Sequence, residues 1–199
     1  MSEAQARRLA PEQRRPLLLA AAEETFARQG YTQTGLAEVA NLAGVSKTLL
    51  YHYFPDGRPQ LYREVMDRLV GQVVDAARQV VRAPTSAEQR VADLVGTLLT
   101  YFEKHRDAYR LLVLEPWGSG DPGVVGQAMA VRARLAGELN ALLAPAGQPL
   151  AVTLAGGAAA MGALLHVCEL SMAGQIERDE ATDVAQRFVH AGLAGLGLV

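Results

Sequence analysis

The sequence predicts an all-α fold with about nine helices. Apolar residues recur every three or four positions along most of the 199 residues, as they do on the buried face of a helix. No segment combines alternating polarity with the Val, Ile and Thr content that is typical of a strand. Half of the residues are hydrophobic, which is enough to build a sizeable buried core.

The expected location is the cytoplasm. The single cysteine, Cys168, excludes an intramolecular disulfide, and the N-terminus lacks the apolar core of a signal peptide. The uncharged run from Leu150 to Cys168 is about as long as a membrane span. Its many Ala and Gly residues favour a helix that packs closely against other helices, so no membrane association is expected.

The first helix is expected from about Pro16 to Gln29. Leu18, Ala22 and Phe26 lie four residues apart on one face, and Gly30 ends the helix. Proline fits the first turn of a helix but clashes further inside, so residues 1–14 are expected to form a flexible arm. This arm either carries its arginines to the minor groove or phosphates of DNA, or is disordered solubilising sequence.

A helix, a tight turn and a second helix follow in the stretch ANLAGVSKTLLYHYF, residues 40–54. Gly44 supplies the turn, and Ser46 is a good N-cap for a second helix from Lys47 to Tyr53. In a helix-turn-helix, the second helix lies in the major groove, where the base edges distinguish all four base pairs. The stretch therefore predicts a local DNA-binding surface.

The rest of the chain is also predicted to be helical. A long helix follows the PDGRP break and ends near Pro84, and another begins at TSAEQ, where Thr85 or Ser86 can cap it. A short helix over RDAYRLLVLEP ends at Pro116, before a Gly-rich connector. Three more helices are expected over Val124–Leu143, Leu150–Met172 and Asp179–Leu196.

Three segments between about Leu18 and Leu61 carry a specific combined pattern. They are LLAAAEETFARQGY, TQTGLAEVANLAGVS and KTLLYHYF, and together they resemble the tetracycline-repressor (TetR) family of bacterial transcription regulators. The resemblance implies a homodimeric repressor that a small effector releases from a pseudo-palindromic operator in double-stranded DNA. It also implies a DNA-binding domain over residues 1–58 and a helical effector-binding and dimerisation domain over residues 59–199.

By this resemblance, Thr34 opens the second helix near a phosphate, and the third helix carries the residues that face DNA. Three departures from the family pattern bear on binding. Gly35 stands where a hydroxyl residue is common, Leu49 stands where threonine is common, and the linker FPDGRPQL is one residue longer than usual. The expected DNA-binding residues are Thr34, Gly35, Ser46, Lys47, Thr48, Tyr51, His52, Tyr53 and Arg58.

The charge of the chain limits DNA binding to a local surface. The net charge is −2, with seven basic and six acidic residues up to Arg58 and an excess of three acidic residues beyond it. The difference between the two parts is small and has the sign that a DNA-binding N-terminal domain requires.

Two further sets of residues are expected in the C-terminal domain. Aromatic rings, methionine sulfurs and a few polar groups suit a pocket for an apolar or aromatic effector. Small residues on one helix and larger ones on the next suit a dimer interface. The expected pocket residues are Tyr101, His105, Tyr109, Trp117, Met129, Met161 and His166, and the expected interface residues are Ala155, Ala158, Gly162, Val184, Phe188 and Leu193.

The sequence shows no catalytic or metal-binding pattern, and no enzyme activity, metal or cofactor is expected. The four histidines are scattered, and none follows a glutamate by three residues as in carboxylate di-iron bundles. His166 and Cys168 are two residues apart and point in different directions on a helix. Two other functions stay open: a helical small-molecule-binding protein or enzyme that uses the C-terminal cavity, and a protein whose N-terminal head docks another protein.

Overall fold

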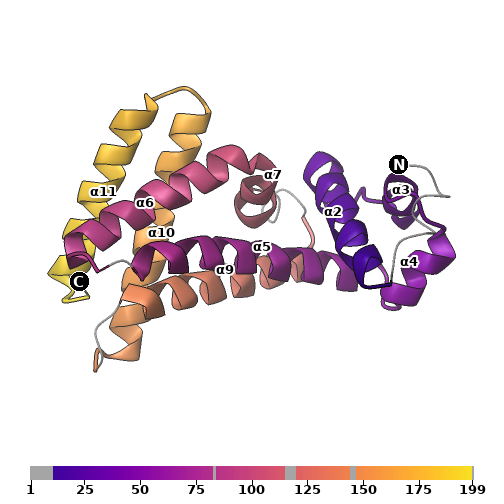
Figure 1. Cartoon of the computed structure of the whole chain (residues 1–199), viewed down its shortest axis with the longest axis horizontal. Coiled ribbons are helices and arrows are strands. Elements are labelled where there is room, and N and C mark those ends of the chain that lie inside the picture. The colour runs from indigo at the N-terminus through magenta and orange to yellow at the C-terminus, as the bar shows by residue number, and fades with distance from the viewer. Residues whose placement is uncertain (1–10, 83, 115–119, 144–146, 199) are drawn as a thin grey trace. The chain divides into compact units, whose positions relative to one another are not determined.

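The structure is a computed structural model that describes residues 11–82, 84–114, 120–143 and 147–198 (Figure 1). Within these ranges it contains nine α-helices and one π-helix, and no strand, so the predicted all-α fold is confirmed. The elements are α2 (Pro11–Gln29), α3 (Leu36–Leu42), α4 (Lys47–Tyr53), α5 (Arg58–Val81), α6 (Ala87–Lys104), α7 (Arg106–Tyr109), η1 (Arg110–Leu114), α9 (Pro122–Leu143), α10 (Leu150–Met172) and α11 (Arg178–Gly195).

The chain divides into two compact units. The first comprises residues 1–69 and 107–129, and the second comprises residues 70–106 and 130–199. Helices α5 and α9 each contribute one part to each unit. The predicted boundary at residue 58 marks the end of the expected DNA-binding domain, whereas the compact units follow backbone packing, so that boundary stays a prediction.

The first unit is built around a cluster of aromatic rings. Phe26 of α2 meets Tyr62 of α5 edge to face at 5.1 Å between centroids, and Tyr31 meets Tyr62 at 5.0 Å. All three are buried, together with Leu50 and Phe54 at the third helix of the unit. Aromatic pairs of this geometry stabilise a core beyond the area that they bury, so α2 and α5 give the short helices α3 and α4 a firm base.

The second unit is a layer of packed helices. Helices α10 and α11 lie side by side along their length, and α6 packs against both (Figure 1). Leu98 of α6, Leu164 of α10 and Leu193 of α11 are all buried between them. At the start of α6, the Ser86 hydroxyl accepts a hydrogen bond from the Gln89 amide at 3.1 Å, as the capping pattern predicted.

The start of the first helix was predicted wrongly. Helix α2 begins at Pro11, so Pro16 lies inside it, and Pro11–Arg14 are helical rather than part of a flexible arm. Pro11 fits the first position of a helix, where its missing N–H has no partner to lose. Tertiary contacts hold the extra turn: Arg15 pairs with Glu64 of α5 at 2.6 Å, and Arg68 donates to the Pro16 carbonyl at 3.5 Å.

Candidate nucleic-acid interface and effector cavity

Helices α3 and α4 form a helix-turn-helix with the local geometry that the sequence predicted. Gly44 has φ +68°, a conformation that glycine adopts without strain, and its amide donates to the Asn41 carbonyl at 3.0 Å. The Ser46 hydroxyl then accepts from the Leu49 amide at 3.2 Å and caps α4. Because Val39 and Leu50 are buried on either side of the turn, the two helices are held in a defined relation.

One face of α4 is exposed and polar. Lys47, Thr48, Tyr51 and His52 are all exposed, whereas Leu50 between them is fully buried. The Lys47 ammonium lies 5.8 Å from the centroid of the Tyr51 ring. Side chains at i, i+1, i+4 and i+5 lie on the same side of a helix, so these four side chains present donors, a hydroxyl and aromatic rings to one partner. We call them the reading face.

The structure places the remaining predicted DNA residues around the reading face in different environments. Gly35 is exposed and is the N-cap of α3, without a side chain to cap the helix. Tyr53 is half-buried, and its carbonyl accepts from Arg15 at 3.3 Å. Thr34 is only 2% exposed, and its hydroxyl donates inward to the Gly30 carbonyl at 2.7 Å.

Arg58 also differs from the other predicted DNA residues. Its guanidinium donates to the Thr32 carbonyl at 2.8 Å and to the Thr34 carbonyl at 3.4 Å, and lies 4.7 Å from the centroid of the Tyr31 ring. Sequence reasoning had placed Arg58 at DNA by resemblance alone. No local pattern indicates these contacts, because 24 residues separate Arg58 from Thr34.

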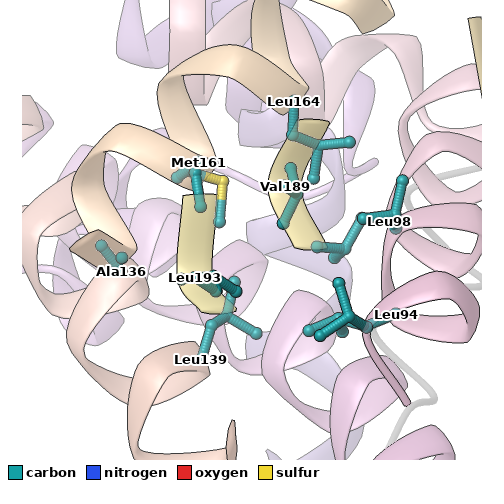
Figure 2. A pocket seen from close by; sticks show the side chains of 12 residues that line it. Leu94, Leu98, Ala136, Leu139, Met161, Leu164, Val189 and Leu193 are labelled. Carbon is teal, nitrogen blue, oxygen red and sulfur yellow. The ribbon is translucent and has the colours of Figure 1, made fainter. Parts of the chain in front are cut away.

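The second unit holds a small apolar cavity of about 40 Å³ between α6, α9, α10 and α11. Figure 2 shows leucine, methionine and valine side chains from these helices converging on it. Its lining includes Leu94, Leu98, Ala136, Met161, Leu164 and Val189. All the lining residues are apolar, so a ligand here is held by shape and apolar contact.

Of the predicted pocket residues that the structure describes, only Met161 lines this cavity. Tyr101 and His105 contact each other, with ring centroids 4.6 Å apart, and the Tyr101 hydroxyl donates to Gln72. Tyr109 is buried in the first unit, and Trp117 lies outside the described residues. Met129 is 56% exposed, and the exposed His166 lies 3.6 Å from Glu169 one turn away on α10.

The predicted interface residues form an exposed face on α10 and α11, with one exception. Ala155, Ala158 and Gly162 are exposed on α10, and Val184 and Phe188 are exposed on α11. Leu193 is instead 3% exposed and lines the apolar cavity, because it lies on the opposite side of α11 from Phe188. Leu150 and Leu154 were not among the predicted interface residues, and they add large exposed apolar side chains to the α10 part of this face.

By length and composition alone, α10 could cross a membrane, and 22% of its most apolar window is buried. Core helices of soluble proteins can be equally long and apolar, so length and composition alone are weak evidence of a membrane span.

Cys168 lies on the inward side of α10 and is fully buried. Burial raises the pKa of its thiol to about 12, the carboxylate of Glu103 adds to the rise, and Arg106 opposes it. Within the described ranges, no three His, Cys, Asp or Glu side chains gather as metal ligands do.

Comparison with known proteins identifies the helix-turn-helix. The family model for bacterial regulatory proteins of the tetR family matches residues 18–65, which include α3, α4 and the turn between them. Residues 18–65 therefore match the DNA-binding region of the TetR family. The matched segment also contains Arg58 and the first residues of α5.

Two curated transcriptional regulators match more of the chain than the family model does. The transcriptional activator FasR of Mycolicibacterium smegmatis is 38% identical over 105 residues, which are 53% of this chain and 48% of FasR. The regulator LuxR of Vibrio harveyi is 29% identical over 112 residues, 56% of this chain and 53% of LuxR. The chain therefore spans about half the length of these curated relatives.

Solved structures match the fold over nearly the whole chain. A TetR-like transcriptional regulator from Rhodococcus sp. RHA1 has a TM-score of 0.71 at 25% identity, covering 94% of this chain and all of that one. FadR of Bacillus subtilis, solved in complex with stearoyl-CoA, also has a TM-score of 0.71, at 14% identity, covering 88% of this chain and 97% of FadR. At that identity, the FadR likeness shows the fold alone.

Proposed function

We propose that this protein is a cytoplasmic, DNA-binding transcriptional regulator of the TetR family whose reading face contacts an operator. The observation that carries the proposal is the exposed reading face on a helix that the Ser46 cap and the Gly44 turn hold in place. Lys47 can donate to guanine or phosphate oxygens, and Thr48 can contact a thymine methyl group or a phosphate. Phosphate contacts set the register, and base contacts select the sequence.

The exposed apolar face of α10 and α11 supports a dimer of identical chains. Small residues on α10 let two helices approach closely, and Phe188 and Leu154 supply apolar area. A twofold dimer presents two reading faces, which then contact half-sites about 34 Å apart in successive major grooves. The operator is accordingly expected to be a pseudo-palindrome.

The apolar cavity supports release of DNA by an apolar effector. Its volume of about 40 Å³ is far below the roughly 300–1,000 Å³ of ordinary ligand pockets, so an effector must widen it by moving α6, α9, α10 or α11. An effector that binds the widened state more tightly shifts the protein toward that state. Helix α5 contributes residues to both units and is the expected carrier of this shift to the helix-turn-helix. FadR of Bacillus subtilis, solved with stearoyl-CoA, shows that a protein of the same fold binds a ligand with a long apolar acyl chain.

A selection from a randomised DNA duplex library, repeated over a series of salt concentrations, tests the DNA-binding function. The expected result is an inverted repeat with half-sites one helical turn apart. Lys47→Ala is expected to weaken binding and, if Lys47 binds phosphate, to reduce the salt slope by about 0.9 for each phosphate that it neutralises in the wild type. Lys104→Ala is the matched control, because it removes the chain's other lysine, which is exposed at the end of α6. Recovery of no preferred sequence would refute the proposed function.

A further inference from the structure

We infer that Arg58 is a positioning residue that holds the entrance of the helix-turn-helix, rather than a ligand for DNA phosphate. The inference rests on the proposed DNA-binding function and deepens it. Arg58 is the first residue of α5, and its guanidinium reaches back to the chain segment that precedes α3. A phosphate ligand instead extends its charge toward solvent, where the phosphate lies.

Arg58 contacts three residues of this segment, Tyr31, Thr32 and Thr34. Its Nη1 donates to the carbonyls of Thr32 and Thr34, and its guanidinium lies over the ring of Tyr31, which is buried in the aromatic cluster of the first unit. Hydrogen bonds from a charged donor are among the stronger ones, and a cation over an aromatic face adds to them. Arg58 thus joins α5 to the backbone immediately before α3.

The segment that Arg58 holds has no side-chain cap at the start of α3. Gly35 is the N-cap of α3 and makes no side-chain hydrogen bond to the helix, so a frequent means of fixing a helix start is absent. The Thr34 hydroxyl bonds back to Gly30 and not forward into α3. Arg58 cannot accept from the free amides of the first turn as a hydroxyl at position 35 would, but its bonds to the Thr32 and Thr34 carbonyls hold the backbone that leads into α3.

The preceding residue connects Arg58 to the reading face. Gly57 has φ +68°, and a Cβ placed on it would lie 3.4 Å from Leu36 Cδ1 in α3 and 3.6 Å from Tyr51 Cε1 in α4. The linker backbone thus lies against both helices, along an open groove that Lys47 and Arg58 also line. A shift of Arg58 relative to the Thr32 and Thr34 carbonyls is therefore expected to move Gly57, and with it the Tyr51 ring that Gly57 lies against.

The test compares Arg58→Lys with Arg63→Lys, which makes the same change at an exposed arginine of the same helix. Lysine keeps the charge, and it binds phosphate well, but its ammonium is not planar and cannot lie flat on the Tyr31 ring while it donates to both carbonyls. Positioning predicts that Arg58→Lys lowers affinity for the selected operator by about tenfold, since the variant loses the planar group that is stacked on Tyr31 and held at both carbonyls. Affinity for a random duplex and the salt slope should stay as in the wild type.

A second variant, Arg58→Gln, separates the roles by salt dependence. Removing a phosphate ligand would reduce the slope of log affinity against log salt by about 0.9 for each phosphate that Arg58 neutralises, whereas removing a positioning residue leaves the slope unchanged. Circular dichroism shows that each variant is folded at the assay temperature, and a merely structural role would leave the ratio of specific to non-specific affinity of the folded protein unchanged. Faster amide exchange at the start of α3 in the DNA-free Arg58→Gln protein is the matching expectation.

The outcomes distinguish this inference from the function on which it rests. Wild-type protein that selects no sequence overturns the proposed function and this inference together. Wild-type protein that selects an operator, while Arg58→Lys binds it equally well, overturns the inference alone. An Arg58→Gln protein with a reduced salt slope also overturns it, because Arg58 then contacts phosphate.

Discussion

Replacing Phe188 by glutamate is expected to separate the proposed dimer without unfolding the chain. Phe188 is 65% exposed in the single chain, so the folded protomer loses little packing when the ring is removed. In a twofold dimer the same ring is buried once from each protomer, so one substitution acts twice. The effect on association should therefore far exceed the effect on folding.

The exposed fraction sets the magnitude. Fully burying a phenylalanine side chain stabilises by about 1.5–3 kcal/mol, so burying the exposed 65% in both copies contributes about 2–4 kcal/mol to the dimer. Because about 1.4 kcal/mol is a factor of ten, Phe188→Glu should raise the dissociation constant of the dimer by about 30- to 700-fold. Repulsion between two introduced carboxylates adds to this.

Sedimentation equilibrium over a range of protein concentrations measures the dissociation constant, and thermal unfolding of the same samples checks the fold. Leu114→Glu is a matched control, because Leu114 is 44% exposed and belongs to the first unit, whereas the face on α10 and α11 belongs to the second. A Phe188→Glu protein with an unchanged dissociation constant would show that this face is not the interface. Equal weakening by Leu114→Glu would show that the effect is not specific to it.

Three further predictions concern stability and reactivity. Gly35→Ser should stabilise the protein by about 0.5–1 kcal/mol in chemical denaturation, because the added hydroxyl can cap α3 and the unfolded chain loses freedom. A Cβ there meets nothing within 4 Å, and Gly35→Ala, which restricts the unfolded chain but lacks the hydroxyl, should stabilise the protein less. The Cys168 thiol should resist alkylation in the native protein at pH 8, because burial raises its pKa to about 12 from the ordinary value of 9.0, and it should react once urea unfolds the chain. Because the pKa of the thiol is higher in the folded state, the unfolded state loses the thiol proton first as pH rises. The stability that depends on Cys168 is therefore intact below pH 9.0 and declines as pH rises toward 12. The free energy of unfolding of Cys168→Ala should depend less on pH in this range. Rapid alkylation of native protein would contradict the burial of the thiol.

Much of the candidate site follows from neighbouring residues. The bounds of α4, the Ser46 cap and the Gly44 turn depend on interactions within a few residues, which a single sequence displays directly. The exposed reading face follows from the helical period once Leu50 is recognised as a core residue. The recurrence of apolar residues every three or four positions likewise sufficed for the helices of the second unit.

Contacts between distant parts of the chain were decided only by the tertiary structure. Arg15 and Glu64 are 49 residues apart, yet their ion pair helps to keep Pro11–Arg14 helical ahead of Pro16. Helical spacing shows that Leu193 and Phe188 face different directions, but it does not show which direction is the core. Both were therefore predicted at the interface, although only Phe188 is exposed. The sequence by itself determined the helices and the reading face, because local hydrogen bonds and the helical period specify them. Packing decided the roles of Thr34 and Arg58, because burial depends on residues far along the chain.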